Sequence, residues 1–479
     1  MEADESTMSV KPTRGRRWVL RLVKFIRYMI VFVVALVLLY IILDQIVWRQ
    51  VVAQRAAFDE RFGVAGEDSA NPEQPSAEEE AGRYYRYAWS LIAKANDEYT
   101  SNDPYTALHD SSGLAELLGT DQPPTPEVVE AFVRDRLAAA RPGLDVALEA
   151  ARMRGGLLSP SSDPEATLQA LAEARNLARY LSARAEIAAR DGDVNEAFTY
   201  VFATLRLART VGESRTILAQ LVQIAIVGIA FDSSQRVLTY GEPATDIVAA
   251  ITIESRNLRK PEQFVRALRG ETIYVRDGLH LTMPRLWAGI NELKMLETLT
   301  AMADAANTDD PNHRRELLTQ AEVSAKQGPY LLYALVQVTA PAVLRSMDAW
   351  ERGVSQTTVM EVGLAISQYH AEHGDYPEAL DAAPPYLGGE VPSDPYTGTP
   401  LMYEKRGAGY VLYSVGPNLK DDGGAPLHGP GGVAGDVVWA IGQPEPHPIA
   451  EAEEAASTPR LQRLQGQQGL QGLFQRRGR

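Results

Sequence analysis

Apolar residues follow three different patterns along this chain. Near the N-terminus they form an unbroken, uncharged run, YMIVFVVALVLLYIIL, at residues 28–43. From Arg83 to about Leu344 they recur three and four positions apart among Ala, Leu, Arg and Glu, which predicts helices that break at Pro or Gly. Beyond Arg345, one further helix precedes short segments rich in Gly, Pro, Tyr and Val. The pattern predicts a mainly α protein with a small C-terminal α+β domain.

The apolar run predicts a transmembrane anchor at residues 28–48, through which the protein would contact the lipid bilayer. As a helix the run reaches about 24 Å, and its flanks can complete a bilayer core of about 30 Å. Residues 1–27 are basic and predict a cytoplasmic N-terminus with the bulk of the chain on the other side. A cleaved signal peptide is the alternative, but its apolar core is usually shorter and no A-x-A site follows.

An acidic linker is predicted at residues 64–82, followed by a helical domain at 83–344. Its clearest unit is a helix at 165–190, an Asp-Gly-Asp turn and a helix at 194–210. This unit resembles a tetratricopeptide-type hairpin, while an ordinary hairpin in a bundle explains the same pattern. Because a solenoid needs about three such units, the pattern favours a bundle or repeat-like body.

Two other apolar segments of this body require comparison with a membrane span. Ile217 to Phe231 is short and carries two glutamines, which favours a core helix. Tyr330 to Leu344 contains Pro341, Gln337 and Thr339, which favours a buried helix. If the second segment did cross a bilayer, the C-terminal domain would return to the cytoplasm.

The C-terminal domain is predicted at residues 345–442. A helix through Met347 to His373 should end at Gly374, which can adopt the left-handed conformation of a helix cap. Leu401 to Glu404 and Tyr410 to Val415 alternate as strands do. The Pro-, Glu-, Gln- and Arg-rich tail at 443–479 predicts disorder.

Composition excludes several functional classes. The 47 basic and 62 acidic residues give a net charge of −15, which argues against a nucleic-acid partner. The chain has no cysteine, so disulfides, thiolate metal sites and cysteine nucleophiles are excluded. It also has no P-loop, dinucleotide fingerprint or G-x-S-x-G element.

Three stretches of the C-terminal domain, over about 85 residues, form a recognisable series: LAISQYHAEHGDYPEAL, then VPSDPYTGTPLMYEKRGAGYVLYSVGPNLKDDGG, then GDVVW. This series resembles the globular domain of the major pseudopilins of type II secretion systems. The matching positions are Tyr369, Gly374, Tyr376, Pro377, Asp394, Pro395, Tyr396, Gly398, Pro400, Ser414, Gly416, Asn418 and Asp436. The resemblance implies a long helix packed on a short antiparallel sheet, in a protein of the bacterial cytoplasmic (inner) membrane.

In that family the last loop binds calcium, which implies a calcium site here. The corresponding oxygen ligands are Asn418, Asp421, Asp422 and Asp436, in a loop with seven glycines. Calcium takes six to eight oxygen ligands, and glycine lets backbone carbonyls turn inward. Asn418 replaces the more usual Asp and the loop is longer than in the family, so a solvated acidic turn without metal is the alternative.

Histidine and acidic residues also crowd the end of the C-terminal helix, at His370, Glu372, His373 and Asp375. Two histidines three positions apart could share a metal, yet the sequence is not HExxH. The Gly-x-Tyr-Pro match gives this segment a structural explanation instead.

Two features separate the chain from an ordinary pilus subunit. The apolar run has no Glu near its start and no prepilin-peptidase site before it. About 300 residues also separate the anchor from the pseudopilin-like domain, whereas in pseudopilins the two form one helix. We therefore expect a membrane-anchored, non-enzymatic scaffold with envelope or secretion components as partners. The alternative is an envelope hydrolase with its site in the helical domain.

Overall fold

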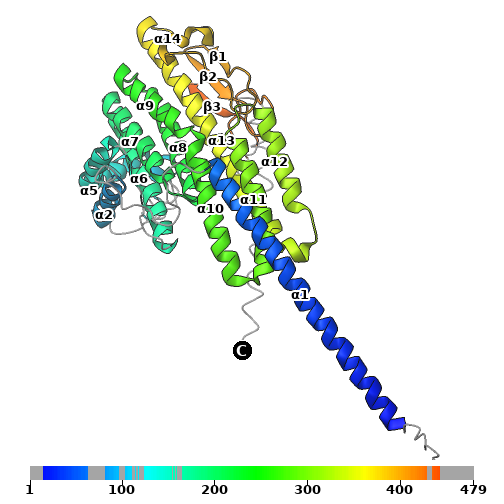
Figure 1. The fold of residues 1–479 in the computed structure, drawn as a ribbon. Helices are drawn as coiled ribbons and strands as arrows, with labels where there is room; N and C mark the ends of the chain where they lie inside the picture. Colours follow the sequence, from blue (N-terminus) through cyan, green and yellow to red (C-terminus); the bar gives the residue numbers. More distant parts are fainter. Residues whose placement is uncertain are drawn as a thin grey trace, which may run out of the picture.

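The protein is predominantly helical in its computed structural model, which describes residues 14–62, 81–95, 103–110, 114, 117, 123–153, 155–156, 158, 164–428 and 434–442. In this part of the chain, one small sheet near the C-terminus accompanies the helices (Figure 1). The helices and strands are α1 (Arg14–Phe62), α2 (Ala81–Ala95), α3 (Pro104–His109), α5 (Pro126–Arg152), α6 (Pro164–Arg190), α7 (Val194–Gly212), α8 (Ile217–Leu238), α9 (Thr245–Leu258), α10 (Pro261–Thr282), α11 (Arg285–Ala306), α12 (Pro311–Lys326), α13 (Tyr330–His373), η2 (Leu380–Ala382), α14 (Pro384–Leu387), β1 (Met402–Arg406), β2 (Gly409–Ser414) and β3 (Val437–Ile441). The mainly α fold with a small α+β region is thus confirmed.

Two hydrophobic cores organise the helices. The first joins α2, α3 and α5 to α9 with the C-terminal half of α13 and the sheet. The second joins α10, α11 and α12 with the N-terminal half of α13 and with Phe58 of α1. Helix α13 contributes to both cores and runs from Tyr330 to His373, so the domain boundary predicted at residue 345 falls inside this helix.

The sequence placed several local features correctly. The hairpin of α6 and α7 turns at Gly192, whose φ of 90° lies in the left-handed region. Gly374 ends α13 with φ 74°, and the strands begin within one residue of their predicted starts. Pro341, by contrast, does not interrupt α13; the non-helical backbone lies at Tyr333. The acidic linker to residue 80 and the tail at 443–479 lie outside the described residues.

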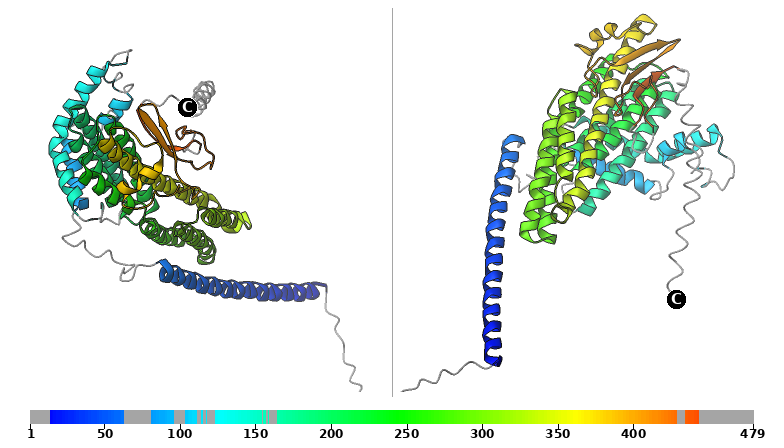
Figure 2. Two further views of the ribbon diagram at one scale, coloured as in Figure 1. Left: turned by 90° about the horizontal axis from the view of Figure 1, so that it is seen from above. Right: turned by 90° about the vertical axis from the view of Figure 1, so that its right-hand side faces the viewer.

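Two described helices are long and apolar enough to cross a membrane, and they differ in burial. Of the most apolar 18-residue segment of each helix, only 6% is buried in α1, against 56% in α8. Figures 1 and 2 show the N-terminal part of α1 extending away from the body, whereas α8 lies within it. Tyr330 to Leu344 is not among these candidates, and Val336 and Ala340 face the second core.

The sheet packs on the C-terminal half of α13 and on α8. Its strands are antiparallel in the order β1-β2-β3. Trp439 is fully buried, and its indole Nε1 donates to the Tyr410 hydroxyl, which donates to the Gly363 carbonyl of α13. Phe231 of α8 meets the same indole edge-on at 5.4 Å between centroids. The C-terminal α+β region therefore shares its core with the helical body.

Candidate functional site

The predicted calcium ligands lie in one loop and have different hydrogen-bond partners. The Asn418 amide donates to Asp422 at 2.7 Å. Backbone N–H groups of Asp422 and Gly424 donate to the two carboxylate oxygens of Asp436. Asp421 turns elsewhere and accepts from the Tyr413 hydroxyl at 2.9 Å. Hydrogen bonds of the loop thus join Asn418, Asp422 and Asp436, while Asp421 accepts from Tyr413 and from the Gly423 backbone.

This arrangement gives calcium a partial fit. Burial, with the charges of Asp422 and Asp421, raises the pKa of Asp436 to about 6, and a cation nearby would offset that effect. Within the described part of the chain, however, no three His, Asp or Glu side chains form a group that could hold a metal. Residues 429–433 of the same loop lie outside the described residues.

At the crowded end of α13, the side chains considered as metal ligands contact other residues. His370 pairs with Glu242 at 2.6 Å, and His373 stacks on Tyr369 at 4.1 Å between centroids. The Tyr386 hydroxyl donates to Glu372, while Lys405 pairs with Asp375. The four candidate side chains therefore have separate structural partners.

A cavity of about 460 Å³ lies where the C-terminal turns meet α12 and α13. Tyr396, from the Asp-Pro-Tyr turn, lines it with a buried hydroxyl that has no hydrogen-bond partner among the described residues. Leu419, from the predicted calcium loop, lies at the cavity with φ 59° and 42% of its surface exposed. Leu318 and Leu344 add apolar wall from the two helices.

Two carboxylates of α13 also line this cavity, Asp348 and Glu351. Burial raises the pKa of both, although nearby arginines oppose that shift. Glu351 pairs with Arg314, which also donates to the Pro395 carbonyl of the turn. The cavity thus combines partly apolar walls with acids whose pKa values are raised, a combination that sequence reasoning missed. Helical spacing of three residues placed the acids on one face, but nothing in the sequence paired them with Tyr396.

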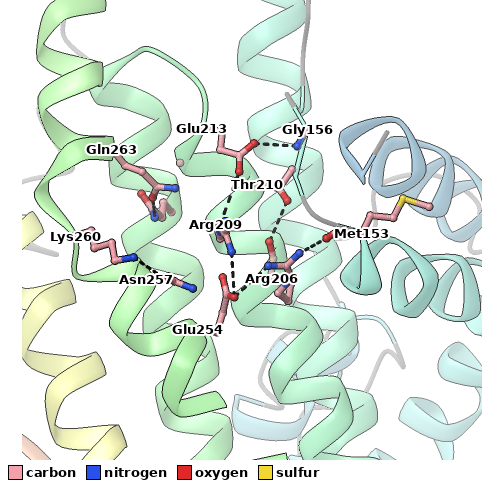
Figure 3. A network of polar contacts seen from close by, with 12 residues as sticks. Met153, Gly156, Arg206, Arg209, Thr210, Glu213, Glu254, Asn257, Lys260 and Gln263 are labelled. Atoms are coloured by element: carbon pink, nitrogen blue, oxygen red, sulfur yellow. Dashed lines mark hydrogen bonds and ion pairs between the residues drawn. The ribbon is translucent and has the colours of Figure 1, made fainter. Parts of the chain in front are cut away.

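A buried charge network joins α5, α7 and α9 (Figure 3). Figure 3 shows Arg206 and Arg209 of α7 directed at Glu254 of α9, at 3.1 and 3.4 Å. Arg206 also donates to the carbonyls of Ala151, in the last turn of α5, and of Met153, which directly follows the helix. Carbonyls at the end of a helix have no intrahelical partner, so Arg206 supplies hydrogen bonds that α5 itself cannot make there.

The same design recurs at three other buried glutamates. Each of these glutamates is at most 3% exposed. Each contacts two arginine or histidine side chains that lie outside its own helix. The three sets are Glu186 with His109 and Arg236, Glu292 with Arg55 and His280, and Glu361 with Arg256 and Arg259. Sequence reasoning identified none of them, because the partners are far apart in the chain.

One of these sets fixes α1 to the body. The Arg55 guanidinium contacts Glu292 of α11, and Arg61 pairs with Asp304 at 2.6 Å. Val51 is fully buried against α11, where Gly289 allows Val47 to approach closely. A second cavity, of about 380 Å³, lies beside this contact between α1, α10 and α11.

Comparison with known proteins gave no match: no family model, no curated protein and no solved structure matches this chain.

Proposed function

We propose that the protein is a non-enzymatic scaffold anchored in the bacterial cytoplasmic membrane. Its N-terminus would lie in the cytoplasm and its body on the other side. Supporting this topology are the basic segment before residue 28 and the exposed apolar surface of α1 at residues 28–43.

The observation that carries the proposal is the continuity of α1. The helix passes without a break from its apolar run into the ion pairs and buried contacts with α10 and α11. A hinge between anchor and body would let the body turn freely, whereas this contact fixes its orientation to the bilayer. A fixed orientation suits a protein that presents a binding surface to membrane or envelope partners.

The cavity beside the pseudopilin-like region is the proposed docking place for such a partner. It combines loops that resemble pseudopilin loops with two helices of the body, so a secretion-like component could contact both. A photoreactive residue at Leu419 tests this in cells, with the same residue at Ile253 of α9 as a matched exposed control. We expect an envelope protein to crosslink at position 419 only. Equal or no adducts at the two positions would contradict the proposal.

Membrane orientation has a separate test. Protease added outside spheroplasts should degrade the body and leave the segment before residue 28 intact. Cleavage of the N-terminal segment with protection of the body would reverse the topology.

We propose further that the loop with Asn418, Asp422 and Asp436 binds calcium. Calcium bound only by the folded state should raise the thermal midpoint of the full-length protein, while magnesium at equal concentration should not. The Asp436→Asn variant should lose this response. An unchanged midpoint of the unaltered protein would refute calcium binding.

A hydrolase is the second candidate function, favoured by the raised pKa of Asp348 and Glu351 beside the Tyr396 hydroxyl. A carboxyl group with a raised pKa is a better candidate for a general acid than one with an ordinary pKa. If this holds, hydrolysis of a panel of nitrophenyl esters and glycosides should be lost in Glu351→Gln. The exposed control Glu316→Gln should keep it. Absence of turnover, or equal turnover in both variants, would remove the hydrolase.

A further inference from the structure

The end of the body from which the apolar part of α1 emerges carries exposed aromatic and apolar side chains. Two connections form this end, Met283–Pro284 between α10 and α11 and Gln327–Pro329 between α12 and α13. Figures 1 and 2 show both hairpin ends on the side from which α1 extends. Trp287 is 41% exposed there and Tyr330 is 62% exposed.

Contacts between helices place these residues at the level where α1 leaves the body. Asp44 pairs with Arg285 at 3.5 Å, so the start of α11 lies beside the end of the apolar run. The Trp48 ring meets His280 edge-on and lies under the Arg285 guanidinium at 4.4 Å. From this level, α1 and α11 run side by side in the same direction, since Arg55 contacts Glu292.

A hydrogen-bonded link brings the first turn of α13 to the same level. The Asn291 amide donates to the carbonyls of both Trp287 and Leu332, at 3.0 and 2.9 Å. Tyr330 and Leu332 therefore lie beside the first turns of α11. Trp48, Trp287 and Tyr330 are all within about one or two helical turns, each about 5.4 Å, of the Asp44 level.

The level of Asp44 can be compared with the dimensions of a bilayer. If α1 spans the membrane with residues 28–43 in hydrocarbon, Asp44 marks the border of the apolar core. The headgroup layer beyond it is roughly 5–8 Å deep on each side. Trp and Tyr prefer this layer because their rings are apolar and their polar tips reach water. Arg285 supplies a cationic group suited to lipid phosphates.

We propose that this end of the body lies in the headgroup layer of the bilayer that α1 spans, with Trp287 and Tyr330 inserted among the lipids. The proposal rests on the membrane anchor proposed above. It makes the body a peripheral membrane domain, held at the surface by three helices rather than suspended from one.

The cysteine-free chain allows a direct test with the full-length protein. Single cysteines replace Trp287, Tyr330, Leu36 in the apolar run, or Ile253 on the distant helix α9. Each carries an environment-sensitive fluorophore, and each protein is reconstituted into phosphatidylcholine–phosphatidylglycerol vesicles. Quenching by aqueous iodide is compared with quenching by nitroxide lipids.

We expect nitroxide lipids to quench the labels at 36, 287 and 330, and iodide to quench the label at 253. If iodide quenches the labels at 287 and 330 while nitroxide lipids quench the label at 36, the membrane anchor stands and the contact of this end with the headgroup layer is refuted. If iodide quenches the label at 36, both the anchor and the headgroup contact are refuted. Protection of 287 and 330 from both quenchers means that protein covers this end, such as a second copy of the chain, and also overturns the proposal.

Discussion

Glu186 illustrates, at the scale of single residues, how the body holds a carboxylate in its core. The side chain accepts from Arg236 at 2.8 Å and lies 3.0 Å from a ring nitrogen of His109. Burial alone would raise its pKa, but these partners outweigh burial and hold the pKa below its usual value. The ionised form is therefore the stabilising one.

The pH dependence of a Glu186→Gln variant follows from this direction. Because the folded-state pKa is lowered, Glu186 contributes stability above its unfolded pKa and loses it as pH falls through the folded one. At pH 7 the substitution should lower the free energy of unfolding by about 1–3 kcal/mol, since it removes the buried carboxylate with which the half-buried Arg236 pairs. In strongly acidic buffer the two proteins should become alike.

Denaturant titrations of the full-length protein in micelles across this pH range measure the difference. Glu173→Gln on the same helix is the control, because Glu173 only accepts from Gln169 at the surface. A Glu186→Gln deficit that stays constant down to acidic pH would contradict the assigned role of the ionised carboxylate.

Gly363 decides, at the scale of elements, how closely the sheet approaches α13. A Cβ atom on Gly363 would lie 2.5 Å from the Trp439 indole, which is closed in by Phe231 and Tyr410. The indole has no free space to move into. Gly363→Ala should therefore destabilise the protein by about 1–3 kcal/mol through overpacking.

Gly228→Ala is a matched control for that substitution. It also places a methyl group in a helix, but the nearest atom, on Gln356, is 3.6 Å away. Alanine lowers the conformational entropy of the unfolded chain, so Gly228→Ala should be neutral or should stabilise the protein by up to about 1 kcal/mol. Thermal melts followed by near-ultraviolet circular dichroism compare the two. Equal behaviour of both variants would show that the sheet does not depend on this close approach.

The sequence allowed prediction of elements where local chemistry decides them. The left-handed glycines at 192 and 374, the positions of β1 and β2 and the apolar character of α8 all follow from short-range patterns. Prediction stopped where distant segments meet. The approach of Trp439 to Gly363 and the cavity at Tyr396 depend on tertiary packing, and no periodicity encodes them. In the loop predicted to bind calcium, the hydrogen bond from the Tyr413 hydroxyl to Asp421 could not be foreseen from the sequence.

At the scale of the whole molecule, α13 links the two hydrophobic cores. Trp350, in its middle, stacks on Phe264 of α10 at 5.5 Å between centroids. Two to four turns further along, Val359 and Ile366 belong to the core that includes the sheet. Loss of order in one core should therefore weaken the other through a continuous helix.

Phe264→Ala tests this coupling. Phe264 is fully buried in the second core, so its truncation should cost about 3–5 kcal/mol. If the cores unfold together, amide hydrogens of β3, which belongs to the first core, should exchange faster by a corresponding factor. Hydrogen exchange of the full-length protein, read separately at β3 and at α11, measures both effects. Faster exchange at α11 with unchanged protection at β3 would mean that the two cores are independent domains, and that the sheet with its half of α13 could move relative to α10 and α11. A shared loss of protection would instead mean that α1, the helical body and the sheet hold one orientation, as the proposed scaffold requires.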